Sequence, residues 1–175
     1  VREKMTEYLI IFSTIDGHTE KICKFISEIL RNKGNVKVIS IYESEKIDLS
    51  TYDSIIIGAS IRYGKHRSNV YNFIEKNVLI LESKVTAFFT VNVVARKKEK
   101  SDPETNPYMK KFIEDVNWTP NYLAVFAGKI DFPKLKLFDR YVIKFIMWLT
   151  KGPTNTKECY DFTDWEKVKS FAEKM

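Results

Sequence analysis

The stretch FSTIDGHTEKI, from Phe12 to Ile22, contains three hydroxyl side chains, an aspartate, a glycine and a histidine. These residue types can bind a ligand at the start of a helix. Gly17 permits a tight turn, and a helix starting near Thr19 would present free backbone N–H groups at its positive dipole end. With the hydroxyls of Ser13, Thr14 and Thr19, this helix start would form a phosphate site. An ordinary N-cap is the alternative, because Ser, Thr and Asp are common there. The spacing matches neither GxGxxG nor GxxxxGKS/T, which argues against a dinucleotide or nucleoside triphosphate site of those kinds.

Two further polar stretches follow later apolar runs. In GASIRYGKHRSN, small residues such as Gly58 and Ala59 allow close backbone approach, and Tyr63 offers a flat face for stacking. In VNVVARKKEK, Asn92 is a candidate polar contact. A solvated surface is the alternative reading of each basic run taken singly. The basic residues of the two stretches, together with one histidine, are Arg62, Lys65, His66, Arg67, Arg96, Lys97, Lys98 and Lys100.

The elements that must position these stretches alternate between strand-like and helix-like patterns. The strand-like runs are 7–14, 36–43, 53–60, 85–94 and 123–132, and the helical segments are 19–32, 68–81, 106–116 and 164–174. Gly34 is a predicted helix C-cap, and Thr163 with Glu166 has capping-box spacing. This alternation predicts an α/β domain over residues 1–175, a doubly wound five-stranded parallel sheet with helices on both faces. Ligands bind at the carboxyl ends of such strands, where all three polar stretches should lie.

The segment 133–157 interrupts the alternation and is interpreted as an amphipathic insertion that divides the fifth strand or extends its exit loop. A helical wheel places Lys136, Arg140, Lys144 and Lys151 in one sector. The apolar face beside it contains Leu137, Phe138, Tyr141, Val142, Phe145, Ile146, Trp148 and Leu149. Its core of about 14 residues is shorter than the roughly 20 needed to span a bilayer. The pattern favours an interfacial membrane helix; packing on the domain or on a dimer partner is the alternative.

Composition narrows the classes of protein further. The chain of 175 residues is 44% hydrophobic and carries a net charge of +6, concentrated after residue 60. This indicates an anionic partner or a solubilising surface, but no nucleic-acid-binding module is recognisable. Cys23 and Cys159 lack metal-ligand spacing and are expected to be reduced core residues, so no metal site is predicted. The opening VREKMTEY lacks a signal-peptide pattern, which predicts an intracellular location, while the origin of Val1–Lys4 before Met5 stays open.

These motifs resemble the flavodoxin family. More specifically, FSTIDGHT, YDSIIIGASIRYGKH, VNVVARKKEK followed by TNPY, DRYVIKFIM and TDWE are similar to the flavodoxin-like, quinone-dependent protoporphyrinogen IX dehydrogenases of haem biosynthesis. The similarity runs from about residue 7 to residue 172. IGASIRYG and VNVVARK are its most specific parts.

The resemblance implies an FMN-dependent oxidoreductase that oxidises protoporphyrinogen IX with a membrane quinone, menaquinone or ubiquinone, in peripheral contact with the cytoplasmic membrane. It carries the family's FMN-binding loops onto Ser13, Thr14, Ile15, Asp16, Gly17, His18, Thr19, Ala59, Ser60, Ile61, Arg62, Tyr63, Gly64, Thr90, Val91, Asn92, Val93, Val94 and Ala95. Asp16 departs from the usual flavodoxin pattern, in which a hydroxyl residue often precedes the glycine. A carboxylate beside a phosphate is unfavourable unless it points away.

The flavin would carry the chemistry, so no catalytic side chain is assigned; His66 is considered only because imidazole titrates near neutrality. His18 is expected to be a helix-start residue. Candidate substrate contacts are Arg62, Lys97, Arg140 and Tyr141. Alternatives are a soluble flavodoxin electron carrier, a class that is usually acidic, and an FMN-dependent NAD(P)H:quinone reductase. The preferred quinone, the docking of the porphyrinogen and a homo-oligomeric state stay open.

Overall fold

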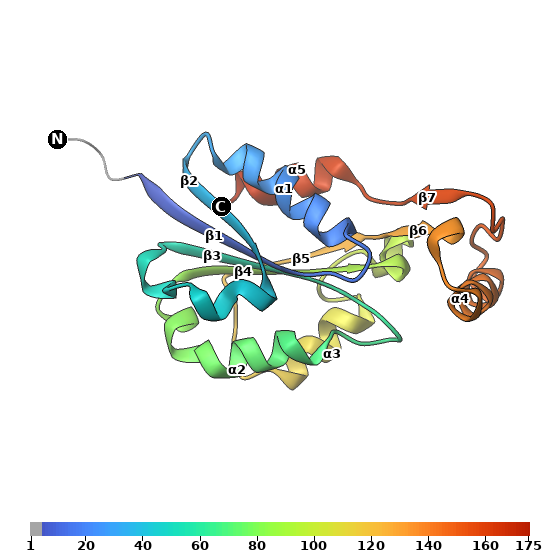
Figure 1. Ribbon diagram of the computed structural model, residues 1–175, viewed down its shortest axis with the longest axis horizontal. Helices are drawn as coiled ribbons and strands as arrows, with labels where there is room; N and C mark the ends of the chain where they lie inside the picture. Colours follow the sequence, from blue (N-terminus) through green and yellow to red (C-terminus); the bar gives the residue numbers. More distant parts are fainter. Residues whose placement is uncertain (1–4) are drawn as a thin grey trace.

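A five-stranded parallel sheet forms the centre of the computed structural model, which describes residues 5–175 (Figure 1). Val1–Lys4, and with them the question of their origin, lie outside the described residues. The strands run in the order β2-β1-β3-β4-β5, and every neighbouring pair is parallel. The strands are β1 (Thr6–Ser13), β2 (Gly34–Ser40), β3 (Ser54–Ser60), β4 (Val85–Asn92) and β5 (Tyr122–Ala127).

Helices cover both faces of this sheet (Figure 1). α1 (His18–Leu30) and α5 (Trp165–Glu173) pack side by side on one face, and α2 (Ser68–Glu82) and α3 (Pro107–Asp115) lie on the other. Two of the three clusters of buried hydrophobic residues in the described part of the chain lie one on each face of the sheet. Ile55 and Ile57 of β3 belong to one cluster and Ile56 to the other, because successive side chains of a strand point to opposite faces. The predicted doubly wound α/β fold is therefore confirmed.

Strand register brings the ends of the central strands together. Ser13 of β1 pairs with Ala59 of β3, and Ala59 pairs with Thr90 of β4. The segments that leave these strands therefore emerge side by side at one edge of the sheet. This is the carboxyl-end edge, where open α/β sheets bind their ligands.

Several local predictions were wrong. Gly34 begins β2 instead of capping α1, and a Cβ on it would lie 2.1 Å from the carbonyl oxygen of Thr6 in the adjacent strand. Thr163 does not cap α5: the Asp164 side chain accepts a hydrogen bond from the N–H of Lys167 (3.1 Å) and the Thr163 hydroxyl donates to the carbonyl of Ala127. Gly34 thus serves close strand packing, whereas Thr163 ties the approach to α5 to β5.

The two cysteines differ. Cys23 is fully buried on α1, as predicted, but Cys159 is exposed on a short outer strand, so its assignment to the core was wrong. Burial raises the pKa of the Cys23 thiol. The sequence around Cys159 forms a strand, but this strand lies outside the main sheet.

The run predicted as one strand over 123–132 is two strands. β5 ends at Ala127, and β6 (Lys129–Asp131) pairs in antiparallel fashion with β7 (Cys159–Asp161). Between β6 and β7 lies α4 (Leu137–Leu149), at the end of the molecule beyond the sheet (Figure 1). The predicted amphipathic helix is present, while its interpretation as an insertion stays a prediction.

Candidate functional site

The first loop at the carboxyl-end edge is closed by its own side chains. Gly17 adopts a left-handed backbone (φ 87°) as the N-cap of α1, and its N–H donates to the Thr14 hydroxyl at 3.0 Å. The carboxylate of Asp16 accepts from the N–H of His18 at 3.2 Å. Asp16 thus satisfies one of the helix-start donors that the sequence assigned to a phosphate. Its direct contact with a cofactor stays a prediction.

Two buried polar atoms near this loop have no hydrogen-bond partner, namely Thr19 Oγ1 and Asn69 Nδ2. The Asn69 side chain is held there by the Ser13 hydroxyl, which donates to its Oδ1 at 3.1 Å. Leaving a buried polar group unpaired costs about 1–3 kcal/mol, so such atoms need an explanation. Two unpaired donors beside the positive end of α1 fit an anionic oxygen. The loop is therefore compatible with a phosphate group.

His18 is a structural residue at this helix start, as expected. Its Nε2 lies 2.7 Å from the Thr163 hydroxyl, which itself donates to the Ala127 carbonyl. Because a hydroxyl has one proton, the imidazole Nε2 must be the donor in this pair. Burial lowers the pKa of His18, although Asp161 opposes the shift.

The second loop, after β3, is a tight hairpin. Arg62 and Lys65 form an antiparallel bridge, and both Tyr63 (φ 50°) and Gly64 (φ 77°) adopt left-handed backbones. The N–H of Ile61 donates to the carbonyl of Val91 at 3.0 Å, which links this loop to β4. Tyr63 is 70% exposed. The Arg62 guanidinium lies over this ring, with its carbon 5.4 Å from the ring centre. Stacking of the Tyr63 ring on a flavin stays a prediction.

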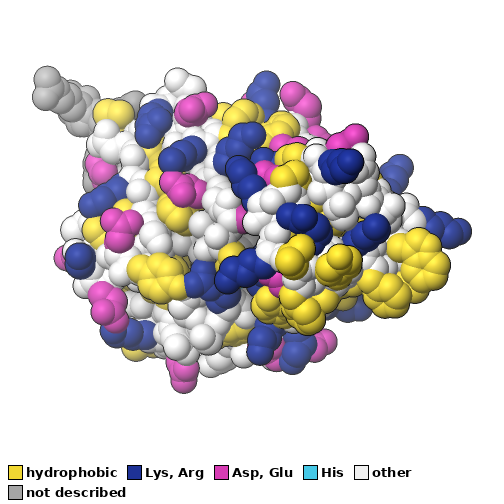
Figure 2. Space-filling model, turned by 45° about the vertical axis from the view of Figure 1, so that its right-hand side comes forward, with side chains coloured by type: hydrophobic (Ala, Val, Ile, Leu, Met, Phe, Trp, Pro, Cys, Tyr) yellow, Lys and Arg dark blue, Asp and Glu magenta, His cyan; other side chains and the backbone are white. Residues whose placement is uncertain are grey.

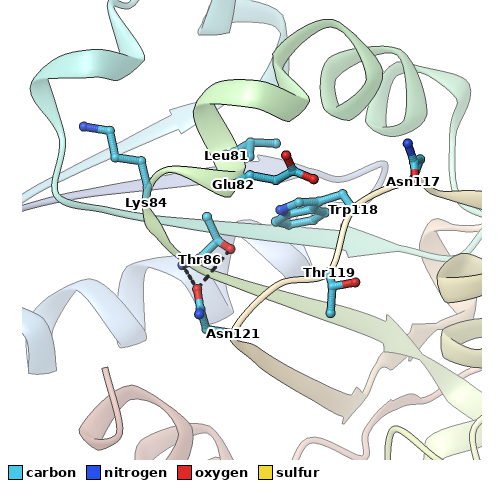
Figure 3. A pocket seen from close by; sticks show the side chains of 8 residues that line it. All are labelled: Leu81, Glu82, Lys84, Thr86, Asn117, Trp118, Thr119 and Asn121. Atoms are coloured by element: carbon cyan, nitrogen blue, oxygen red, sulfur yellow. Dashed lines mark hydrogen bonds between the residues drawn. The ribbon is translucent and has the colours of Figure 1, made fainter.

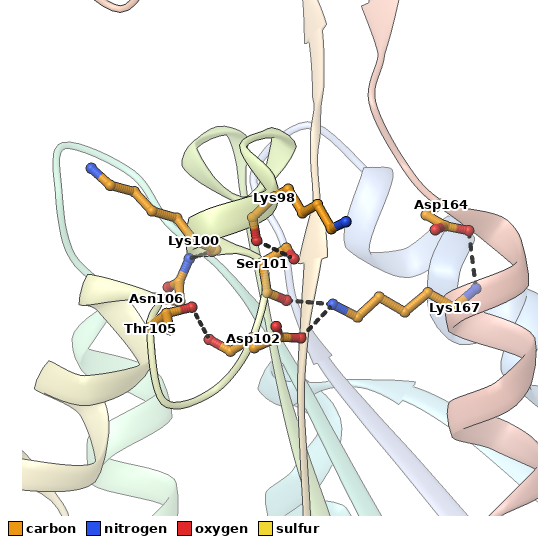
Figure 4. A network of polar contacts seen from close by, with 8 residues as sticks. All are labelled: Lys98, Lys100, Ser101, Asp102, Thr105, Asn106, Asp164 and Lys167. Carbon is orange, nitrogen blue, oxygen red and sulfur yellow. Dashed lines mark hydrogen bonds and ion pairs between the residues drawn. The ribbon is translucent and has the colours of Figure 1, made fainter.

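The third loop, after β4, is organised by two buried amides. Asn92 Oδ1 accepts hydrogen bonds from the N–H of Ala95 (3.0 Å) and from the amide of Asn106 (3.1 Å). Asn106 also caps α3 by accepting from the N–H groups of Tyr108 and Met109. The third loop is also tied to α5, since Lys167 Nζ donates to the Ser101 carbonyl and lies 3.4 Å from an Asp102 oxygen (Figure 4). This loop is therefore fixed from two sides.

His66 is buried, with only 3% of its surface exposed. Its Nε2 lies 2.9 Å from the Thr90 hydroxyl, and its ring packs edge-on against Phe88 and Phe112. Burial lowers the pKa of His66 to about 4, so the imidazole is neutral at physiological pH. This neutral side chain contacts Thr90 of β4 in the interior. A role of His66 in the reaction stays a prediction.

A pocket of about 370 Å³ lies between the first and second loops. It is lined by Ile15, Arg62, Tyr63, Lys65, His66, Arg67, Ser68 and Tyr71. The Arg67 guanidinium donates to the Thr14 carbonyl at 2.7 Å and to the Tyr42 hydroxyl, so it also holds the first loop. The pocket thus joins the phosphate-compatible loop to the exposed Tyr63.

A second pocket, of about 180 Å³, lies at the opposite edge of the sheet (Figure 3). It lies near the amino end of β4, where the Thr86 N–H donates to the Asn121 side chain at 2.8 Å. The Trp118 ring lies against it, with its indole nitrogen buried and unpaired. No predicted site residue lines this pocket, so it is separate from the candidate functional site.

The four candidate substrate contacts have different environments. Arg62 forms an ion pair with Asp139 of α4 at 2.9 Å, and Arg140 donates to the carbonyls of residues 132, 133 and 135. Both guanidinium groups are thus engaged within the chain. Lys97 is half-buried at the end of the third loop, and Tyr141 is exposed on α4. The structure brings Arg62 to the pocket, whereas Arg140 stabilises the start of α4.

Four residues of this edge were missed or left without their roles by the sequence interpretation. They are Arg67, Asn69, Asn106 and Asp139. The helix-start signals TNPY and HRSN could have indicated Asn106 and Asn69. No local signal indicates Asp139, because its partner Arg62 lies 77 residues earlier.

The sheet order 2-1-3-4-5, with three polar loops at its carboxyl-end edge, defines a flavodoxin-like nucleotide-binding α/β protein. A flavodoxin-domain family model matches residues 9–157. Curated relatives of this chain are called protoporphyrinogen IX dehydrogenase (quinone). The Escherichia coli K12 protein is 40% identical over 168 residues, covering 95% of this chain and 93% of its own length. The Leishmania major protein is 37% identical over 166 residues, covering 94% and 72%.

Solved structures agree on the fold. A short-chain flavodoxin associated with a bacterial microcompartment matches with a TM-score of 0.51 at 15% identity, covering 97% of this chain and 95% of its own. The flavodoxin of Megasphaera elsdenii gives 0.50 at 16% identity, covering 67% and 84%. The chain therefore belongs to the flavodoxin-domain family and, within it, to the group of the protoporphyrinogen IX dehydrogenases (quinone).

Proposed function

We propose that this protein is an FMN-dependent oxidoreductase that converts protoporphyrinogen IX to protoporphyrin IX and passes the electrons to a quinone. The observation that carries the proposal is the 40% identity, over 95% of the chain, to a protein named for this reaction. The geometry supports it, because three loops suited to a flavin nucleotide lie at one edge of a flavodoxin sheet.

FMN, when bound, would supply the redox chemistry, which takes electrons from the porphyrinogen and passes them to the quinone. The side chains contribute binding and orientation. The first loop, with Thr19 and Asn69, would hold the phosphate through buried donors that now have no partner. The second and third loops would contact the ring system, with Tyr63 exposed beside the pocket and Asn92 fixing the turn after β4.

The decisive experiment gives the FMN-loaded protein protoporphyrinogen IX under anaerobic conditions, with and without menaquinone or ubiquinone. Porphyrin formation, followed by its fluorescence, should depend on added quinone. Failure of quinone to accelerate it would reject the proposal. Rapid bleaching of the flavin by NADPH would instead indicate a general quinone reductase, and the absence of both reactions an electron carrier.

The same proposal includes contact with an anionic membrane surface through α4. Seven apolar or aromatic side chains of α4 are exposed: Leu137, Phe138, Tyr141, Phe145, Ile146, Trp148 and Leu149. Figure 2 shows hydrophobic side chains among Lys and Arg at the end of the molecule that carries α4. Asp139 and Met147 are buried and Ile143 is half-buried, so these face the domain. Among residues 5–175, no helix has the length and apolarity to cross a bilayer.

An apolar face with neighbouring cations gains free energy from apolar burial and from attraction to anionic lipid. Lys136, Lys144 and Lys151 are exposed around this face, whereas Arg140 is bound to backbone carbonyls. A lipid-soluble quinone would then be reached where α4 meets the lipid surface.

Sedimentation with vesicles tests this contact. The double variant F145S/W148S should bind vesicles containing anionic phospholipid at least about tenfold more weakly than the unchanged protein, since two large aromatic side chains are lost from the face. The control L79S removes a similarly exposed apolar side chain, 82% exposed on α2, far from α4 in the sequence. Equal binding of all three proteins would reject membrane contact through α4.

A further inference from the structure

Helix α4 is attached to the candidate cofactor loops at both ends. Near its start, Asp139 accepts two hydrogen bonds from the second loop: Arg62 donates to Oδ2 at 2.9 Å and the Tyr63 hydroxyl donates to Oδ1 at 2.7 Å. At its end, the Arg96 guanidinium of the third loop donates to the Thr150 carbonyl (3.0 Å) and hydroxyl (2.9 Å). The helix therefore bridges two loops that leave neighbouring strands.

The contact of Asp139 with the second loop is strong because the carboxylate is buried and its hydrogen bonds are charge-assisted. The residue is only 6% exposed, and each carboxylate oxygen is used by the same loop. Hydrogen bonds that involve an ionised partner are shorter and about twice as strong as neutral ones. Its two partners hold a hairpin in which Tyr63 has a left-handed backbone, a conformation that surrounding contacts must maintain in a non-glycine residue.

The Arg96 contact is equally close-fitting. A cation at a helix C-terminus is favourable, because it meets the negative end of the helix dipole. A Cβ on Gly152 would lie 2.9 Å from the Arg96 guanidinium and 2.2 Å from the Met147 side chain, so the chain passes tightly around this group. The two contacts leave little freedom for α4 to move relative to the loops.

We propose that Asp139 is a positioning residue for the flavin: through Arg62 and Tyr63 it fixes the second loop in the form that receives the ring system, with Arg96 as the matching clamp on the third loop. The inference rests on the proposed FMN binding. Arg62 then serves the cofactor loop through Asp139, and is not available as a substrate contact while this pair is formed. It also makes α4 part of the cofactor site, although its exposed face points away from it.

The test measures FMN and riboflavin affinity by quenching of flavin fluorescence, and the midpoint potential of the bound flavin. Asp139→Asn should lower the affinity for both flavins by about tenfold or more, in line with the loss of a charge-assisted hydrogen bond. It should also shift the midpoint potential of the bound flavin. Both flavins respond because the second loop would contact the ring system and not the phosphate. The control Glu75→Gln removes one exposed carboxylate of α2 and should leave every value unchanged.

Tyr63→Phe provides the second variant, since it removes one hydroxyl from an exposed side chain and keeps the ion pair. Tyr63→Phe should lower the affinity for both flavins by a smaller factor. The double variant Y63F/D139N should bind both flavins no more weakly than D139N alone. Flavin affinity within twofold of the unchanged protein in D139N, or in Y63F if D139N does not fold, overturns the inference. Failure of the unchanged protein to bind either flavin would instead count against the proposed function.

Discussion

The imidazole Nε2 of His66 lies 2.9 Å from the hydroxyl of Thr90, so a buried histidine supports the strand end at the centre of the candidate site. His66 follows the second loop in sequence, and Thr90 lies on β4 beside Ala59 of β3. The contact thus connects two of the three loop regions through the interior. Its neutrality is part of the arrangement, because a charged imidazole would be poorly solvated among Phe88 and Phe112.

This pair predicts a loss of stability in mild acid. The pKa of His66 is about 4 in the folded protein, lowered by burial from 6.5, so the unfolded chain binds more protons between these values. The contribution of neutral His66 to the free energy of unfolding is therefore fully present above about pH 6.5, and it is lost as the pH decreases toward 4. The free energy of unfolding should drop by about 2 kcal/mol between pH 7 and pH 5, measured by urea denaturation.

Histidine variants identify the source of this pH dependence. The chain has two histidines, and the pKa of His18 is lowered in the same direction. The variant H66Q should lose most of the difference between pH 7 and pH 5, and H18Q a smaller part. A full wild-type difference in H66Q would show that another group is responsible.

The unpaired hydroxyl of Thr19 predicts opposite effects on stability and on cofactor binding. In Thr19→Val, a buried polar atom without a partner becomes a methyl group of similar size. Without ligand, the free energy of unfolding should stay equal or rise by up to about 1 kcal/mol. The affinity for FMN should fall by about tenfold, because a hydrogen bond to a charged phosphate is lost.

Riboflavin, which lacks the phosphate, is the control ligand for this variant. Its affinity should be the same in T19V and in the unchanged protein, both measured by flavin fluorescence. Equal weakening of riboflavin and FMN would mean that Thr19 acts through the shape of the loop and not through the phosphate. This pattern differs from that expected for Asp139→Asn, in which both flavins bind more weakly.

The difference between the two cysteines predicts their reactivity. Cys23 is buried and burial raises its thiol pKa, whereas Cys159 is exposed. A thiol-specific chromogenic reagent should therefore modify one thiol per chain in the native protein and two in guanidinium chloride, because the thiolate at an accessible site is the reactive species. In C159S the native protein should show no rapidly reacting thiol. Rapid reaction in that variant would indicate that α1 opens readily.

The sequence predicts well what depends on local pattern. The buried strands are continuous apolar runs, such as SIIIGAS, and Pro107 marks a helix start, so the five-stranded sheet and four helices on its faces could be placed. The position of the three loops at one edge of the sheet could then be predicted, because parallel strands all end at the same edge. The ends of strands with small residues were harder to predict. Glycine is common just after a helix, but Gly34 begins β2 because only a residue without a Cβ fits against the Thr6 carbonyl.

The contacts that complete the candidate site depend on long-range packing and could not be read locally. Arg62 looks like a free surface cation until α4 brings Asp139 within 2.9 Å. His66 looks like a loop histidine until Phe88 and Phe112 surround it. In both cases the partner is 20 or more residues away, beyond any local pattern. The assignment of the loops to FMN came from resemblance, and the roles of individual loop residues stay predictions.

Gly58 provides a last prediction, about packing beneath the second loop. A Cβ built on this residue of β3 would lie 2.2 Å from the ring of Phe89 on β4, with two further ring atoms within 2.8 Å. Gly58→Ala should therefore force Phe89 to move and lower the free energy of unfolding by about 1–3 kcal/mol, the usual cost of overpacking a core. Gly128→Ala is the matched control, because its nearest atom would lie at an ordinary 3.5 Å. Urea denaturation should show a lower midpoint for G58A and little change for G128A; equal midpoints would mean that the Phe89 ring adapts without cost.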